Sequence, residues 1–179
     1  MSLHPDFQSV PCQKLLNGED IKILETHTGQ LSDSEKTLVD SVFLQTFYRA
    51  DGIRAQITFE RVTSEPDAIL RWEHCFLMSL GPGLDGKAGR AHGGFIASIM
   101  DHIAGSVAVR VSRSHYPPTA NLIVDYAAPV NTPRVVLCRA WAVERSGRKT
   151  LVRGCIEDAD GLVLARGRAL FIDQKPEKI

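Results

Sequence analysis

A long segment near the middle of the chain carries almost no charge. Residues 93–111 read GGFIASIMDHIAGSVAVRV, and only Asp101, His102 and Arg110 among them can be charged. A helix that is apolar on nearly every side, in a soluble protein, must be enclosed by other structure. We therefore expect one buried helix here, with the rest of the chain arranged around it.

Strand-like segments flank this helix in the sequence. Ile57 and Phe59 alternate with polar neighbours, and a second extended run spans 70–80. Short turns join four further strand-like segments after the helix, at 119–130, 134–145, 149–158 and 162–173. Helix and strands are segregated rather than alternating along the chain. We predict an α+β fold in which one curled antiparallel sheet wraps one helix.

The first 52 residues carry weaker signals. Residues 1–31 have no sustained periodicity and are expected to form an arm beside the domain. Ser32 and Glu35 form a capping box, and apolar residues at helical spacing continue until Gly52, which predicts a helix. We divide the chain into an N-terminal arm and helix (1–52), a main domain (53–173) and a C-terminal tail (174–179).

Composition excludes several classes of function. Lys plus Arg and Asp plus Glu both number 21, so a net charge of zero supplies no field that would attract nucleic acid. The four cysteines have no zinc-site spacing, and we expect reduced thiols, no metal and no cofactor. No apolar run approaches the roughly 20 residues that span a membrane, and we find no signal peptide. We expect a cytoplasmic protein, or a mitochondrial one if a natural leader is missing.

The start of the buried helix is a candidate anion site. Two glycines, Gly93 and Gly94, leave the first backbone N–H groups without covering side chains, and these groups have no acceptor within the helix. A carbonyl oxygen placed there would be polarised, and the oxyanion that develops during acyl transfer would be stabilised. The alternative is that the two glycines only permit close packing.

Asp101 favours the chemical interpretation. Its neighbours one turn away are all small: Ala97, Ser98, Ala104 and Gly105. We expect the carboxylate to lie in a groove on an apolar helix, where desolvation would raise its pKa and make it a better proton acceptor. The alternative is that Asp101 caps a loop or pairs with an arginine such as Arg110 or Arg139.

The spacing between His92 and Asp101 predicts an assembly. Nine residues of helix turn through about 900° and rise about 13.5 Å, so the two side chains face opposite ways. They cannot meet over one carbonyl group within a chain. Two copies related by a two-fold axis could pair the helix start of one with Asp101 of the other. We expect an active homodimer with two composite sites.

The strings HGGFIASIMD and TANLIVDYAAP, with the final run of strands, resemble the hotdog-fold acyl-CoA thioesterases. The resemblance is to the branch with an HGG signature, related to phenylacetate-pathway and THEM-type enzymes, and covers about residues 53–173. It implies a long central helix wrapped by an antiparallel sheet of five to six strands, here with an extra N-terminal helix. It also implies two chains joined edge to edge, often paired again into a tetramer.

The same resemblance assigns roles to residues. The amides of Gly93 and Gly94 would hold the thioester oxygen, and Asp101 from the partner would act as base or nucleophile. His92 would position the loop or contact substrate. Thr119 corresponds to a residue that assists near the scissile bond in some members, and Asn121 is a weaker candidate.

One departure and one basic cluster complete the prediction. The phenylacetate-pathway branch has an Asn about six residues before its motif histidine, where this chain has Gly86 beside Asp85, and this favours the THEM-like or fungal-like branch. Basic residues in the long loop and the 145–149 hairpin suit the phosphates of coenzyme A, although a solvated hairpin would look the same. These candidate contacts are Arg90, Arg145, Arg148 and Lys149.

We expect a cofactor-free thioesterase that hydrolyses an acyl-CoA to a carboxylic acid and CoA. Two alternatives stay open. A protein of the same fold can bind acyl-CoA without catalysis, although an intact Asp101 near Gly93 argues against this. A hotdog enoyl-CoA hydratase or dehydratase would need a histidine and an acid placed over carbons 2 and 3 of the acyl chain.

Overall fold

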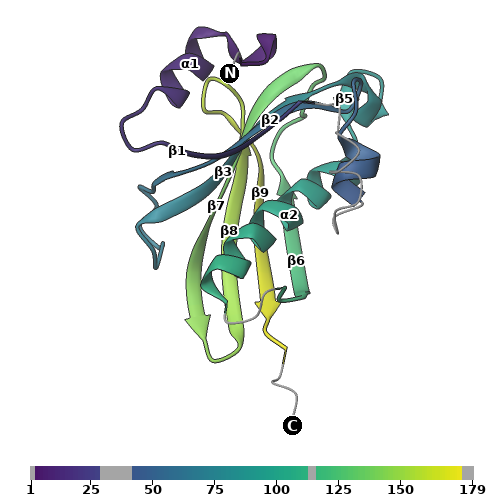
Figure 1. Cartoon of the computed structure of the whole chain (residues 1–179). Helices are drawn as coiled ribbons and strands as arrows, with labels where there is room; N and C mark the ends of the chain where they lie inside the picture. Colours follow the sequence, from purple (N-terminus) through teal and green to yellow (C-terminus); the bar gives the residue numbers. More distant parts are fainter. Residues whose placement is uncertain (1–2, 29–41, 113–115, 175–179) are drawn as a thin grey trace.

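One long helix, α2 (Gly93–Val111), lies against the concave face of a seven-stranded sheet (Figure 1). The computed structural model describes residues 3–28, 42–112 and 116–174. The strand order is β1-β2-β3-β7-β8-β9-β6, and every neighbouring pair is antiparallel. The α+β class and the wrapped central helix are therefore confirmed. The strands are β1 (Lys22–Thr28), β2 (Ile53–Val62), β3 (Trp72–Leu80), β6 (Thr119–Tyr126), β7 (Arg134–Ser146), β8 (Lys149–Glu157) and β9 (Val163–Ile172).

The strand count differs from the prediction of five to six. The additional strand is β1, which lies in the segment expected to be an irregular arm. Most of its residues are exposed because it forms one edge of the sheet, so no alternation of apolar and polar residues marks it in the sequence. A short helix, α1 (Val10–Leu16), precedes it.

Helix α1 covers part of the sheet face opposite α2. Phe7 and Cys12 are buried with Ala55, Ile57 and Phe59, the outward residues of β2. The arm therefore closes a second, smaller core. Most of the helix predicted from Ser32 lies outside the described residues, and its end forms a π-helical turn, Val42–Phe47.

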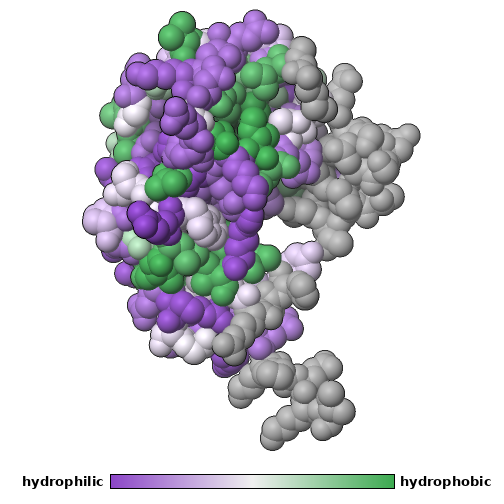
Figure 2. Space-filling model, turned by 60° about the vertical axis from the view of Figure 1, so that its left-hand side comes forward, coloured by the Kyte–Doolittle hydropathy of each residue, from purple (hydrophilic) through white to green (hydrophobic). Residues whose placement is uncertain are grey.

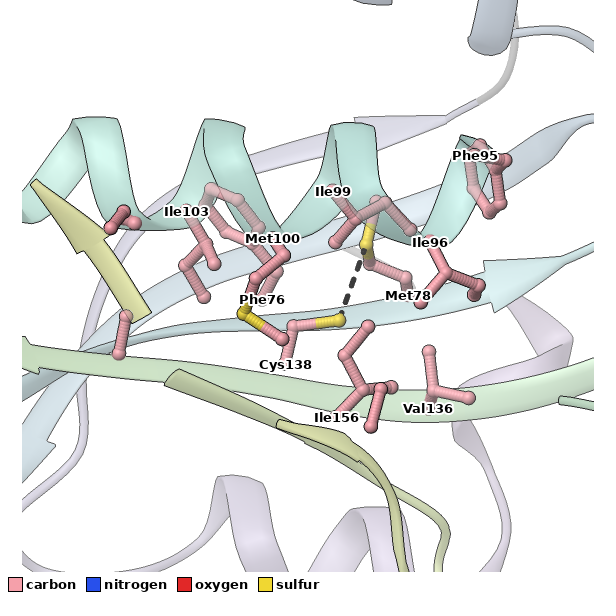
Figure 3. Close-up of a cluster of buried hydrophobic side chains, with 14 of the residues drawn as sticks. Phe76, Met78, Phe95, Ile96, Ile99, Met100, Ile103, Val136, Cys138 and Ile156 are labelled. Atoms are coloured by element: carbon pink, nitrogen blue, oxygen red, sulfur yellow. Dashed lines mark hydrogen bonds between the residues drawn. The ribbon is translucent and has the colours of Figure 1, made fainter. Parts of the chain in front are cut away.

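The main core joins α2 to the middle strands (Figure 3). Ile96, Ile99, Met100 and Ile103 of α2 face Phe76 and Met78 of β3, Val136 and Cys138 of β7, and Ile156 of β8. Gly167 of β9 allows this approach, because a Cβ there would lie 2.2 Å from Met100 Cγ. Within the described residues, α2 is the one helix whose length and hydropathy would suit a membrane span, but eight of its residues are buried in this core.

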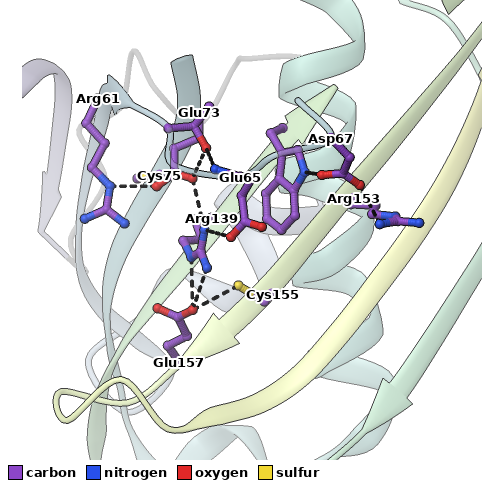
Figure 4. Close-up of polar contacts among 11 residues, drawn as sticks. Arg61, Glu65, Asp67, Glu73, Cys75, Arg139, Arg153, Cys155 and Glu157 are labelled. Carbon is purple, nitrogen blue, oxygen red and sulfur yellow. Dashed lines mark hydrogen bonds and ion pairs between the residues drawn. The ribbon is translucent and has the colours of Figure 1, made fainter. Parts of the chain in front are cut away.

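A network of charged side chains occupies the outer face of the sheet (Figure 4). Arg139 lies 2.6 Å from Glu65, 3.1 Å from Glu73 and 2.9 Å from Glu157. Glu73 is almost fully buried and also pairs with Arg61 at 2.6 Å. Each buried charge therefore has an opposite partner, as its burial requires. Arg139 is therefore bound to three carboxylates within this network.

Candidate functional site

The loop before α2 is fixed at several points. It contains a 3-10 turn (Pro82–Leu84) and a small hairpin of β4 (Asp85–Lys87) and β5 (Arg90–Ala91). The His92 amide donates to the Leu84 carbonyl at 2.8 Å, and the Ala91 amide donates to the Val130 carbonyl at 2.9 Å. These hydrogen bonds make the loop an ordered support for the helix start.

His92 is the N-cap of α2. Its Nδ1 accepts a hydrogen bond of 2.9 Å from the Gly94 amide, and its carbonyl accepts one of 3.1 Å from the Ile96 amide. One of the two glycine amides predicted to bind the thioester oxygen therefore already has an acceptor. Because Nδ1 accepts, the neutral ring carries its proton on Nε2.

Gly93 is the exposed first residue of α2, and no acceptor for its N–H lies among the described residues. Its carbonyl accepts a hydrogen bond of 2.9 Å from the Tyr126 hydroxyl. A Cβ added at Gly93 would meet nothing closer than the Tyr126 ring, at 3.6 Å, which is an ordinary contact. Packing within the chain therefore does not require glycine here.

Asp101 lies halfway along α2 and is partly exposed. Its Oδ1 accepts a hydrogen bond of 2.8 Å from the Thr119 hydroxyl at the start of β6. The arginines considered as alternative partners are bound elsewhere: Arg110 lies 2.7 Å from Glu60, and Arg139 binds the carboxylates of the outer network. The structure thus brings Asp101 and Thr119 together. We expected a groove that encloses the carboxylate, but within the single chain Asp101 is partly exposed.

Asn121 lies on the opposite face of the sheet from Asp101. It pairs in register with Leu170, whereas Leu122 pairs with Ala169, and side chains opposite each other in register share a face. Leu122 and Ala169 belong to the core around α2. Asn121 therefore points away from α2, and the structure does not bring it to Asp101 in the single chain.

The predicted phosphate contacts separate into two groups. Arg145 lies 2.5 Å from the Asp173 carboxylate, and Arg148 donates to the Asp173 carbonyl at 2.8 Å. Asp173 also accepts from Ser112, which follows the C-terminal end of α2, so this hairpin lies at the far end of the helix from Gly93. Arg90 and Lys149 are exposed, and no partner of either side chain lies among the described residues.

Three residues near the helix start escaped the sequence prediction. Tyr126 and Ser98 hold carbonyls of the glycine pair; the Ser98 hydroxyl donates to the Gly94 carbonyl at 2.9 Å. Gly86 was noted only as a departure from the phenylacetate-pathway pattern. A Cβ at Gly86 would lie 2.6 Å from the His92 ring, so an asparagine at that position would force His92 to shift.

The other flank of α2 borders a cavity of about 850 Å³. Among its lining residues are Gln56 and Thr58 of β2, His74 of β3, and His102 and Arg110 of α2. Figure 2, which brings the left-hand side of Figure 1 forward, shows hydrophobic surface interrupted by hydrophilic side chains. Burial lowers the pKa of His74, and the positive charges of Arg110 and His102 lower it further, to about 4 from its usual 6.5.

This pKa predicts acid sensitivity. Below pH 6.5 the unfolded chain protonates His74 while the folded chain does not until about pH 4, so the contribution of His74 to stability is intact above pH 6.5 and lost as the pH falls. The expected loss between pH 6.5 and 4 is about 3 kcal/mol. Urea unfolding of wild type and His74→Gln across this range measures it. Equal pH slopes for the two proteins would contradict the prediction.

Comparisons with known proteins bear on the family and on the fold. Residues 88–165 match the family model described as the thioesterase superfamily. The chain is 36% identical over 99 residues to acyl-coenzyme A thioesterase THEM4 of Rattus norvegicus, which is 55% of this chain and 42% of that protein. It is 36% identical over 101 residues to the THEM4 protein of Xenopus laevis, which is 56% of this chain and 45% of that protein. The matches span less than half the length of these relatives.

Solved structures support the fold. Zebrafish thioesterase superfamily member 2 superposes with a TM-score of 0.53 at 16% identity, over 64% of this chain and 81% of that one. A Streptococcus mutans protein bound to acetyl CoA superposes with a TM-score of 0.54 at 16% identity, over 59% of this chain and 84% of that one. The predicted resemblance to hotdog-fold thioesterases is confirmed.

Proposed function

We propose, from the match of residues 88–165 to the thioesterase superfamily, that the chain hydrolyses acyl-CoA thioesters to carboxylic acids and free CoA. Within the structure, the observation that supports this proposal is the exposed Gly93 N–H at the start of α2. It is a donor without an acceptor among the described residues, on a glycine that packing within the chain does not demand. A donor of this kind at a helix start suits an oxyanion.

The proposed reaction uses two groups, the Gly93 amide and the carboxylate of Asp101. The thioester oxygen binds at the Gly93 amide and gains negative charge as a nucleophile adds to the carbonyl carbon. Asp101 of the partner subunit either takes a proton from the attacking water or adds directly to the carbonyl carbon. Collapse of the tetrahedral intermediate then breaks the carbon–sulfur bond and releases CoA as its thiolate. The first route leaves the carboxylic acid, and the second leaves an anhydride with Asp101 that water hydrolyses to the acid and the free carboxylate. Single turnover in heavy-oxygen water separates the routes, because only direct attack labels the Asp101 carboxylate.

The roles of the neighbouring residues follow from their contacts. Thr119 donates to Asp101 Oδ1, which leaves Oδ2 as the oxygen for proton transfer or attack. The Gly94 amide is held by His92 Nδ1, so Gly94 contributes mainly by leaving the helix start uncovered. Because Arg145 and Arg148 bind Asp173 at the far end of α2, the exposed Arg90 in the loop before α2 is the better candidate for the CoA phosphates. Lys149 is also exposed, but it lies on the hairpin at the far end of the helix.

A homodimer supplies the second half of each site. The strand β6 lies at one end of the sheet order and pairs only with β9 among the described strands, so one edge is open to a partner. Thr119 and Tyr126 at its two ends both contact α2. Pairing of two β6 edges would bring the neighbouring helices together, and a further pairing of dimers is compatible with it.

A panel of acyl-CoAs assayed with a thiol reagent tests the proposal. We expect release of free CoA that is stoichiometric with the carboxylic acid formed. Binding without thiol release would favour the non-catalytic alternative. Hydration of an enoyl-CoA with its thioester intact would favour the hydratase alternative.

A further inference from the structure

The start of α2 is built from the two residues least able to hold a fixed conformation. Glycine loses more backbone freedom on folding than any other residue, and it lowers helix stability by about 1 kcal/mol relative to alanine. Gly93 and Gly94 occupy the first two positions of the helix. An oxyanion site needs the opposite property, because its donors must be fixed before the charge develops. Other groups must therefore hold this pair.

Three side chains do so. His92 Nδ1 accepts from the Gly94 amide at 2.9 Å, and the Ser98 hydroxyl donates to the Gly94 carbonyl at 2.9 Å. Both belong to α2 or its cap, so they move with the helix start. The Tyr126 hydroxyl donates to the Gly93 carbonyl at 2.9 Å from β6, a separate element. Tyr126 is thus the contact that ties the glycine pair to the sheet.

The peptide group between Gly93 and Gly94 is held at both ends. Its carbonyl accepts from Tyr126, and its N–H donates to His92. Because a peptide group is planar, these two bonds fix its orientation. This orientation sets ψ of Gly93 and so restrains the neighbouring Gly93 N–H, the donor without an acceptor. The Tyr126 ring also lies 3.6 Å from the position of a Gly93 Cβ, beside the same donor.

We propose that Tyr126 is a positioning residue for the oxyanion site: from β6, its hydroxyl holds the Gly93–Gly94 peptide so that the Gly93 N–H is aimed before substrate binds. The effect on catalysis rests on the proposed function, whereas the restraint of the Gly93–Gly94 peptide by Tyr126 does not depend on it. The same strand also carries Thr119, which binds Asp101. Strand β6 thus contacts one residue of each half of the composite site, Gly93 through Tyr126 and Asp101 through Thr119.

The substitution Tyr126→Phe removes the hydroxyl and keeps the ring. We expect kcat to fall at least about tenfold with KM changed less than about twofold, because the lost bond acts on a donor used in the transition state. In a Gly93→Ala background the same change should have much less effect, since the two residues act on one donor. Additive losses in the double variant would overturn the proposal. Tyr116→Phe, at an exposed tyrosine away from α2's start, is the matched control.

A second measurement does not depend on activity. Backbone ¹⁵N relaxation of the full-length protein reports the order of the Gly93 and Gly94 amides. In Tyr126→Phe we expect their order parameters to fall from about 0.85 toward 0.6, with Tyr116→Phe unchanged. Unchanged order at both glycines would overturn the inference even if the enzyme is active. Lowered order in a protein that cleaves no acyl-CoA would instead overturn the proposed function and leave the inference standing.

Discussion

Asparagine at position 101 should reduce kcat for acyl-CoA hydrolysis by about 10²- to 10⁴-fold, the range expected for loss of a general base. The amide keeps the shape of the carboxylate, and its oxygen can still accept the Thr119 hydroxyl, which donates at 2.8 Å in the wild type. It can neither accept a proton from water nor add to a thioester. KM should change little, because the carboxylate acts on the nucleophile rather than on bound CoA.

The matched control for Asp101→Asn is Asp125→Asn. Asp125 is an exposed aspartate of β6 that pairs in register with Arg166 on the outer face of the sheet, away from α2. The control removes the same charge and should keep wild-type rates. Release of thiol by Asp101→Asn at the wild-type rate, with acyl-CoA bound equally by both, would end the enzymatic interpretation.

Alanine at position 93 should lower kcat by about 10²- to 10³-fold, comparable to removal of one oxyanion donor. The N–H remains, but the new methyl group occupies the space beside it that a thioester oxygen must enter. Stability should change by no more than about 1 kcal/mol, since alanine favours helix and the added Cβ meets only the Tyr126 ring at 3.6 Å.

Thermal unfolding and steady-state kinetics on the same Gly93→Ala preparation separate these two effects. A large fall in kcat with an unchanged melting temperature is the expected pair of results. A variant with wild-type kcat would show that the bare helix start has no part in the reaction. Gly93 would then have no function in the reaction.

The sequence allowed the central helix and most of the sheet to be predicted because burial leaves a pattern. Residues 93–111 are apolar on nearly every side, and the helix Gly93–Val111 has those limits. Strand β1 left no such pattern, because an exposed edge strand buries neither face. Its pairing with β2 is a long-range contact, which local residue types do not encode.

The site was only partly predictable for a related reason. Asp101 and Gly93 stand out because a charge and a bare backbone are unusual on a buried helix. The groups that hold them come from β6, whose register depends on a bulge between Thr119 and Asn121. This bulge places Thr119 on the face toward α2 and Asn121 on the other face. Likewise, Arg145 and Arg148 both bind Asp173, which follows β9 and is distant from them in the sequence.

The composite nature of the site is tested most directly by mixing subunits. Asp101→Asn and Gly93→Ala chains, each inactive alone, are unfolded together and refolded. Random pairing makes about half of the dimers mixed, and each mixed dimer has one intact Gly93 facing one intact Asp101, so about one quarter of wild-type activity should return. If the mixed sample forms dimers but stays as inactive as its parents, the two groups do not act across the interface.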